Sequence, residues 1–266
     1  NPQVNSFIDG VIYTVDVRGL YQGSNYSYYF EAVDVNGDTA TGEATIEQSG
    51  PIVEVVSNWV AQNSNVTQNL NSVTFVDSLD GWAVGDGGII IYTTDGGTTW
   101  SQQTSGTNNN LYSLAFPDKN IGYVVGDATI LKTIDGGLNW LPYTTSEDLR
   151  SVSFANILNG WAASYTGAIL RTQNGGSTWV EMRAGGTSQL NAIEFINSKI
   201  GWAVGADYLI LKSTDAGTSW TTVLNAPVGH ALRNINFIDV KRGWAIGSND
   251  NGEVIKSTDG ATTWAT

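Results

Sequence analysis

Carboxylates are the side chains with which this chain could most readily do chemistry. It has 25 Asp and Glu residues but a single histidine, His230, and no cysteine. Thiol catalysis and metal sites built from cysteine or clustered histidine are therefore excluded, and no metal or cofactor is expected. Carboxylates can act in pairs, as in glycoside hydrolysis, which usually needs two of them about 5–10 Å apart.

Most of the conspicuous acids recur at a fixed place in one motif, Ser/Thr-x-Asp-x-Gly-x-Thr-Trp. The motif is complete at 93–100 and 213–220, and degenerate at 133–140, 172–179 and 257–264. A short polar side chain in a tight turn accepts hydrogen bonds from nearby backbone N–H groups, and the glycine two residues later supplies a positive φ. Regular repetition therefore favours a structural role for the residues at the acidic position. They are Asp95, Asp135, Asn174, Asp215 and Asp259.

Glu194 is the acid that breaks the repeating pattern. It stands in a column otherwise filled by small polar residues and alanine: Thr74, Ala115, Ser153 and Asn236. One carboxylate is not a mechanism, and few of the six arginines lie where a sialidase-like site would use them. Catalysis is therefore the weaker hypothesis, with a sialidase-like or xyloglucanase-like glycosidase, or its accessory module, as the alternative.

These motifs sit in a repeated unit of about forty residues. Each unit has a strand A that ends in Phe, such as 70–75, a strand B such as 81–85, an apolar strand C, and a strand D that starts at a closing tryptophan. The closing tryptophans are Trp100, Trp140, Trp179, Trp220 and Trp264. A period near forty with four short strands is typical of a β-propeller blade. The sequence predicts an all-β fold with a five-repeat propeller over residues 51–266.

The motif resembles the Asp-box, or bacterial neuraminidase repeat. Together with the Gly-Trp-Ala-Val-Gly strand it is most similar to the repeat of the photosystem II assembly/stability factor family, over residues 59–266. The resemblance implies a propeller that acts as a non-enzymatic scaffold in protein complexes, with arginines at one face as the contact surface. Only Arg150 and Arg233 occupy such positions here.

Residues 1–50 do not share the repeat. They predict strands at 11–17, 26–35 and 39–47, with Asn36-Gly37 as a hairpin turn. The pattern of glycines and aromatics over 19–37 resembles part of a fibronectin type III or immunoglobulin-like β-sandwich. We expect a domain junction at Gly50-Pro51, and a chain that belongs to a larger multidomain protein.

The sequence leaves the closure of the ring open. Trp59 stands 41 residues before Trp100 and enters the same frame. Either the ring continues beyond residue 266, or residues 52–61 supply a missing D strand and close five blades. Continuation is favoured, because Trp59 and Trp264 would otherwise compete for one position.

Loop lengths predict which end of the propeller binds a partner. The connection between strands A and B is constant in all five repeats, whereas the D–A and B–C connections vary. Variable loops on a rigid scaffold are where binding residues concentrate. The predicted contact residues are Tyr112, Arg150, Tyr165, Asp207, Tyr208, Arg233 and Asp250.

The net charge limits the partners. It is −13 at pH 7, which disfavours nucleic acid and anionic membranes, and no apolar run is long enough to span a bilayer. We expect a non-enzymatic scaffold that contacts a protein or a neutral polysaccharide, located outside the cell or at its surface, within a larger assembly.

Overall fold

The computed structural model describes residues 3–8, 11–16, 61–186, 188–224, 231–248 and 252–265. The chain divides into two compact units, residues 1–61 and 62–266. In the first unit β1 (Gln3–Ile8) pairs antiparallel with β2 (Val11–Asp16). β2 agrees with the strand predicted at 11–17. The strands predicted at 26–35 and 39–47, the sandwich, the junction at Gly50-Pro51 and Trp59 all lie outside the described residues.

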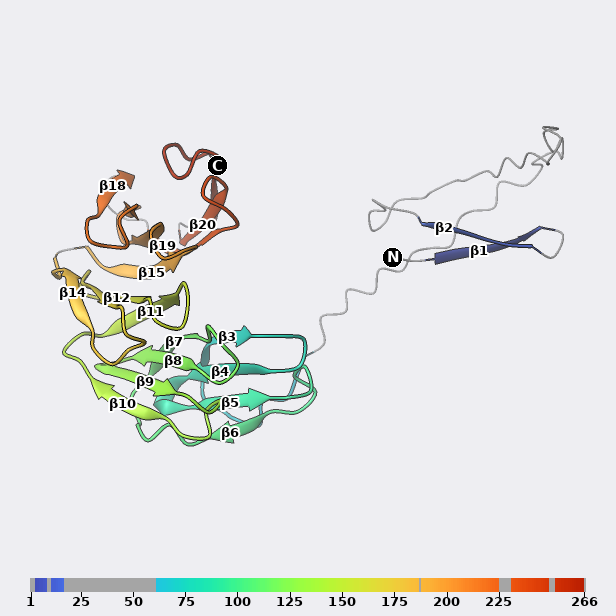
Figure 1. The fold of residues 1–266 in the computed structure, drawn as a ribbon, viewed down its shortest axis with the longest axis horizontal. Coiled ribbons are helices and arrows are strands. Elements are labelled where there is room, and N and C mark those ends of the chain that lie inside the picture. The colour runs from blue at the N-terminus through green and yellow to red at the C-terminus, as the bar shows by residue number, and fades with distance from the viewer. Residues whose placement is uncertain are drawn as a thin grey trace. The chain divides into compact units, whose positions relative to one another are not determined.

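The second unit is a propeller of five blades, drawn from cyan to red in Figure 1. Blade 1 holds β3 (Leu70–Phe75), β4 (Gly81–Gly85), the short 3₁₀ helix η1 (Asp86–Gly88), β5 (Ile90–Thr93) and β6 (Ser101–Gln103). Blade 2 holds β7 (Leu111–Ala115), β8 (Gly122–Gly126), β9 (Thr129–Thr133) and β10 (Leu141–Thr144). Blade 3 holds β11 (Leu149–Phe154), β12 (Gly160–Ser164), β13 (Ile169–Thr172) and β14 (Val180–Arg183). Blade 4 holds β15 (Leu190–Phe195), β16 (Gly201–Gly205), β17 (Ile210–Ser213) and β18 (Thr221–Leu224). Blade 5 holds β19 (Ala231–Phe237), β20 (Gly243–Ser248) and β21 (Glu253–Ser257).

Each blade is an antiparallel sheet in which neighbouring strands follow one another along the chain. The strands therefore fill the predicted positions A, B, C and D, and the predicted propeller of four-stranded blades is confirmed. Blade 5 differs in having three strands, with a single bridge between Lys256 and Ala265 where its fourth strand would start. Strand B is buried along its whole length in blades 1 to 4, because it lies inside the sheet and is covered on both faces.

Aromatic rings join each blade to the next. The strand-B ring of one blade stacks on the Phe that ends strand A of the following blade, as Trp82 stacks on Phe116 with ring centroids 3.9 Å apart. The closing tryptophan then meets the same Phe edge-on, as Trp140 does at 6.0 Å. The same pair of contacts recurs at all four interfaces between blades. These rings bury large apolar areas between successive blades.

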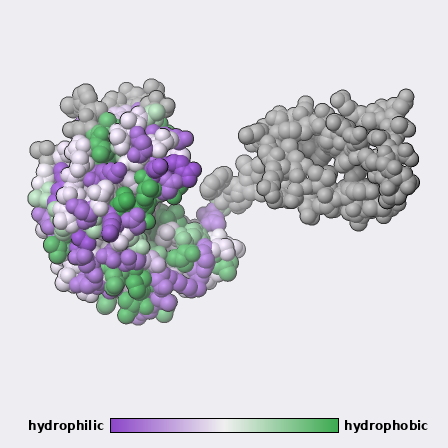
Figure 2. Space-filling model, turned by 45° about the horizontal axis from the view of Figure 1, so that its top comes forward, coloured by the Kyte–Doolittle hydropathy of each residue, from purple (hydrophilic) through white to green (hydrophobic). Residues whose placement is uncertain are grey.

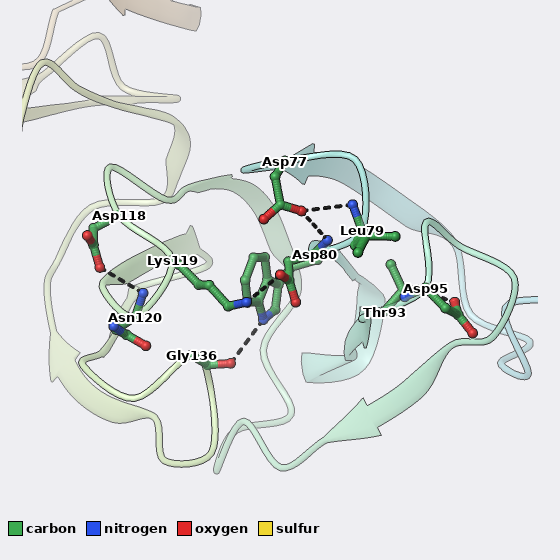
Figure 3. Close-up of polar contacts among 10 residues, drawn as sticks. Asp77, Leu79, Asp80, Thr93, Asp95, Asp118, Lys119, Asn120 and Gly136 are labelled. Carbon is green, nitrogen blue, oxygen red and sulfur yellow. Dashed lines mark hydrogen bonds and ion pairs between the residues drawn. The ribbon is translucent and has the colours of Figure 1, made fainter.

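The A–B connection has a constant length because one side chain shapes it. The Asp77 carboxylate accepts hydrogen bonds from the backbone N–H groups of Leu79 and Asp80, as Figure 3 shows. An Asn or Asp occupies the same position in every blade and accepts at least one of these bonds: Asp118, Asn156, Asn197 and Asp239. Such Asx turns fix the loop geometry.

Hydrophilic residues cover much of the propeller surface in the view of Figure 2, with hydrophobic residues in separate patches. No helix among the described residues is long and apolar enough to cross a membrane.

Candidate binding face

The D–A and B–C loops meet at one end of the propeller, which we call the loop face. The backbone N–H that follows strand B donates to a carbonyl just before strand A of the same blade. Asp86 bonds Asn69 in this way, and Tyr165 bonds Asp148. The Asp-box loops lie at the opposite end, where they bond the A–B connections, as Gly96 bonds Leu79. The two ends are therefore built from different loops, as the strand order requires.

Arg150 forms the most distinctive site on the loop face. Its guanidinium carbon lies 4.0 Å from the ring centroid of Tyr112 and 4.9 Å from that of Tyr165. Its Nε atom is buried without a hydrogen-bond partner. Among the described residues the ion pairs are Lys119–Asp80 and Arg242–Asp239, so none involves Arg150. The structure thus brings together three of the seven predicted contact residues around a cation with no acidic partner.

Asparagines take the equivalent place in other blades and bond the next blade instead. Asn71 Nδ2 donates to the Leu111 carbonyl at 2.8 Å and also to the Asp86 carboxylate at 2.9 Å. Asn191 Nδ2 likewise donates to the Leu232 carbonyl at 2.7 Å. The hydrogen bonds from Asn71 and Asn69 lower the pKa of Asp86. In blades 1 and 4 these side chains hold neighbouring blades together, whereas Arg150 in blade 3 lies against two tyrosines.

The other predicted contact residues lie apart from Arg150. Asp207 and Tyr208 form the B–C turn of blade 4, with φ values of 56° and 53°, and Tyr208 packs against the core between blades 4 and 5. Arg233 is exposed on β19. Asp250 and His230 lie outside the described residues.

The Asp-box carboxylates are saturated within their own loops. Asp215 Oδ1 accepts from the Ser219 backbone N–H at 2.9 Å and the Ser213 hydroxyl at 2.8 Å, and Oδ2 accepts from the Ser219 hydroxyl at 2.6 Å. The Ser219 hydroxyl and N–H contribute most to lowering the pKa of Asp215 to about 2. Equivalent bonds surround Asp95, Asp135, Asn174 and Asp259. This geometry is what the predicted structural role requires.

Glu194 joins blades 4 and 5. Its Oε2 accepts from the Phe237 backbone N–H at 2.7 Å and its Oε1 from Asn236 Nδ2 at 3.1 Å. Ser153 does the same one blade earlier, since its hydroxyl accepts from the Phe195 N–H at 3.0 Å. Burial raises the pKa of Glu194 to about 7, although the two hydrogen bonds act in the opposite direction. The residue that breaks the sequence pattern therefore fills a position that already links blades.

The sequence analysis missed several contacts between blades. Lys132 and Lys212 each donate from Nζ to a glycine carbonyl in the Asp-box loop of the next blade, at 2.6 Å. Gln103 Oε1 accepts from the Trp140 indole N–H at 3.2 Å. The lysines could have been found from their recurrence in strand C, whereas Gln103 belongs to the poorly repeating strand D.

The described residues contain no group of three or more His, Cys, Asp or Glu that could hold a metal ion. At the loop face, the Arg150 cation lies against the rings of Tyr112 and Tyr165.

One family model matches the chain. Its description is photosynthesis system II assembly factor YCF48, and it matches residues 52–140, 102–183 and 141–227. No curated protein matches the chain.

Solved structures agree on the fold. A structure of YCF48 bound to a D1 peptide is 23% identical, with a TM-score of 0.61 over 75% of this chain and 68% of that one. The GH74 enzyme of Niastella koreensis is 17% identical, with a TM-score of 0.62 over 74% of this chain and 38% of that one. The GH74 xyloglucanase of Xanthomonas campestris is 13% identical, with a TM-score of 0.61 over 77% and 38%. The chain thus spans less than two fifths of these GH74 structures, and likenesses at such identities show the fold alone.

The predicted extracellular or cell-surface location is wrong. The family match and the YCF48 structure both point to assembly factors of photosystem II, which work where that photosystem is assembled and not outside the cell. The expectation rested on the sandwich-like pattern of residues 1–50. Neither that pattern nor the amino-acid composition determines where a protein is located.

Proposed function

The chain belongs to the family of the photosystem II assembly factor YCF48, and on this premise we propose that its propeller is a non-enzymatic scaffold that binds a segment of a partner protein. The contact surface is the loop face, with Arg150 between Tyr112 and Tyr165 as its anchor. The single observation that carries the proposal is this cation, which has aromatic neighbours and no acidic partner among the described residues.

The chemistry of Arg150 indicates what the partner segment offers. A guanidinium binds a carboxylate through two parallel hydrogen bonds, and flanking rings hold its plane in place. Arg and Tyr are also the residues enriched at the energetic centres of protein interfaces. The segment therefore presents a carboxylate, from a side chain or a chain terminus, to Arg150. Because the chain carries a net charge of −13, the rest of the segment is neutral or basic.

A protein partner fits this site better than a neutral polysaccharide. A neutral sugar could pack against the tyrosine rings, but it has no charge to pair with the guanidinium of Arg150. The glycosidase alternative has little support, because both oxygens of Glu194 accept hydrogen bonds from blade 5. A YCF48 structure holds a D1 peptide, which makes D1 peptides the first candidates for this chain too.

The proposal is tested with fluorescently labelled D1 peptides and fluorescence anisotropy. The unmodified protein binds, and Arg150→Ala weakens binding at least about tenfold, as the loss of a central interface residue does. Amidation of the peptide carboxylates weakens binding to the unmodified protein and has little further effect on Arg150→Ala. Arg242→Ala is the matched control, because Arg242 lies in an A–B connection and pairs with Asp239.

A triple variant tests the face as a whole. Tyr112, Tyr165 and Tyr208 are changed to Ala together, and peptide retention is lost while the circular dichroism spectrum is kept. If this variant still retains the peptide and Arg242→Ala or Asp118→Ala does not, the contact lies at the Asp-box end and the proposal is wrong. Retention of a neutral polysaccharide on a glycan array, without peptide binding, would replace the protein partner by a glycan.

A further inference from the structure

The B–C turn of blade 3 departs from the repeat at the residue that ends strand B. Ser164 stands there, whereas the other four blades have glycine: Gly85, Gly126, Gly205 and Gly247. In blades 1, 2 and 4 a side chain at that glycine would meet the carbonyl of the residue before strand A. In blade 3 Ser164 is completely buried and pairs with Leu149 at the start of strand A. Its hydroxyl therefore lies inside the turn that carries Tyr165.

A chain of three hydrogen bonds runs through this turn. The Ala168 backbone N–H donates to the Ser164 hydroxyl at 3.0 Å, and the hydroxyls of Ser164 and Thr166 lie 2.8 Å apart. The Thr166 hydroxyl donates to Glu147 Oε2 at 2.5 Å. A hydroxyl has one proton, so Thr166, which gives its proton to Glu147, accepts from Ser164. All the donors therefore point toward Glu147, whose carboxylate is the acceptor at the end of the chain.

Bonds from outside hold the turn in place. Arg183, on β14, donates from its guanidinium to the Gly167 carbonyl, and the Tyr165 N–H joins the turn to the D–A loop. Tyr165 and Thr166 are neighbours in this turn. Each side chain has a defined contact, since the ring lies against Arg150 and the hydroxyl bonds a carboxylate.

Glu147 lies three residues before Arg150, in the segment that enters strand A. Among the described residues no ion pair joins the two, although a guanidinium attracts a carboxylate that can reach it. The bond to Thr166 explains this, because it holds the carboxylate on the B–C turn. The equivalent residue of blade 2, Asn109, also bonds its own B–C turn, at the Asp127 carbonyl, but it carries no charge.

A second position removes another internal partner from Arg150. Tyr165 stands where blades 1 and 2 have Asp86 and Asp127. In blade 1 that carboxylate accepts a hydrogen bond from Asn71, the residue equivalent to Arg150. An aspartate at position 165 would therefore lie within reach of the guanidinium. Tyr165 places an uncharged ring there instead.

We propose, on the basis of the proposed function, that Thr166 is a positioning residue of the partner site. It holds the Glu147 carboxylate away from Arg150 and so keeps the guanidinium for the carboxylate of the partner segment. When the Thr166 hydroxyl is lost, the carboxylate loses its charge-assisted hydrogen bond. Glu147 then pairs with Arg150 and competes with the partner.

The binding test uses the labelled D1 peptides and Thr166→Val, which removes the donor and keeps a side chain of similar shape. Thr166→Val weakens binding about fivefold or more, since an internal carboxylate then competes for the guanidinium. Adding Glu147→Gln restores binding to within about twofold of the unmodified protein, because a neutral side chain does not compete. Thr166→Ser keeps the hydroxyl and loses at most about twofold.

The rescue separates this role from a purely structural one. If Thr166→Val acts only by loosening the turn, Glu147→Gln does not restore binding and the proposal is wrong. It is also wrong if Thr166→Val binds as the unmodified protein does while Arg150→Ala does not, and the proposed function then stands without it. Thr98→Val is the matched control and binds normally, because the Thr98 hydroxyl donates to the Asp95 carbonyl in an Asp-box loop.

An NMR test needs no partner, so it decides the proposal even if D1 peptides do not bind. In protein whose arginines carry an NMR-active nitrogen isotope, the Nε–H signal of Arg150 is assigned by its absence from Arg150→Lys. The signal moves in Thr166→Val and returns when Glu147→Gln is added. Circular dichroism checks folding, and Thr166→Ala replaces Thr166→Val if the latter is not folded. A signal that stays in place, or a shift at Arg183 instead, would overturn the proposal.

Discussion

The two ends of the propeller hold their loops in place with different kinds of contact. At the Asp-box end each blade repeats one set of bonds. A Ser or Thr hydroxyl accepts from the N–H four residues on and donates to the side-chain oxygen of an Asp or Asn, as Thr93 does to Asp95. At the loop face each blade differs, with Asn71 bonded to Asp86 in blade 1 and Arg150 between two tyrosines in blade 3. The Asp-box end repeats one local network in every blade, which holds the loop in place. The loop face varies from blade to blade, as expected of the end that carries specific contacts.

The largest expected effect comes from a ring that ties the core to the Asp-box end. Trp161 is fully buried, stacks on Phe195 at 3.5 Å, and donates its indole N–H to the Ala216 carbonyl at 2.9 Å. Trp161→Ala therefore lowers the free energy of unfolding by about 3–5 kcal/mol, measured by urea denaturation. Tyr165→Ala at the loop face, where the ring is exposed, changes it by less than about 0.5 kcal/mol. Equal losses would break the distinction between the ends.

A direct comparison of the ends uses two aspartates of blade 4. Asp215→Ala removes an acceptor of three hydrogen bonds, so Tm falls by several degrees. Asp207→Asn on the loop face leaves Tm nearly unchanged, because Asn tolerates the left-handed backbone at φ 56° as Asp does. Because hydrogen bonds lower the folded-state pKa of Asp215 to about 2, its contribution is present above the pKa of the unfolded chain and is lost as pH falls toward 2.

The pH series supplies the check on that reasoning. The Tm difference between the unmodified protein and Asp215→Ala shrinks as pH is lowered from 5 to 2. A difference that stays constant over this range would mean that the carboxylate charge is not what holds the loop.

Glu194→Gln tests the inner strands, which run between the two ends. Burial raises the pKa of Glu194 to about 7, above its unfolded value, so its contribution to stability is full below the unfolded pKa and is lost as pH rises through 7. Relative to the unmodified protein, the variant therefore gains about 1–2 kcal/mol between pH 5 and pH 8, a value limited by solvent screening. Urea denaturation at the two pH values measures the gain, and a variant that tracks the unmodified protein at both would refute the linkage.

The smallest effect is expected where one Asp box already departs from the others. Asn174 accepts the Thr178 N–H at 3.0 Å and donates from Nδ2 to the Thr178 hydroxyl at 2.9 Å. In Asn174→Asp the hydroxyl reverses and donates, as Thr99 does to Asp95. Stability at pH 7 stays within about 0.5 kcal/mol of the unmodified protein. A clearly larger loss by urea denaturation would show that the five boxes are not interchangeable.

The fold could be predicted because the repeat aligns five copies of each strand. The strands expected at 70–75 and 81–85 are β3 and β4 without a residue of difference. The alternation of apolar and polar residues along a strand and the closing tryptophan are local signals. Because each occurs in five copies, an irregularity in one copy does not obscure the strand boundaries. The closure of the ring carries no such signal, because it depends on the angle between blades.

The candidate site was predicted only in part. Loop lengths indicated one end of the propeller, and three residues named there, Tyr112, Arg150 and Tyr165, lie together in the structure. That this end binds a partner stays a prediction. Nothing in the sequence says that Arg150 lies against Tyr112, 38 positions earlier, and Tyr165, 15 positions later. Those contacts depend on how the loops and neighbouring blades align. For the same reason Glu194 could be recognised as unusual but not as the acceptor of a bond from blade 5.

The nearest-neighbour character of the contacts between blades has an evolutionary consequence. Each blade gives a strand-B ring, and often a lysine, to the next and receives the same from the one before, as with Trp202, Lys212 and Phe237. A blade added by in-frame duplication of one unit would therefore already have the faces that pack on the blades before and after it. After deletion of one unit, the two blades on either side would still have matching faces. Genes of this kind can change the size of the ring in single steps, while the loop face diverges one blade at a time.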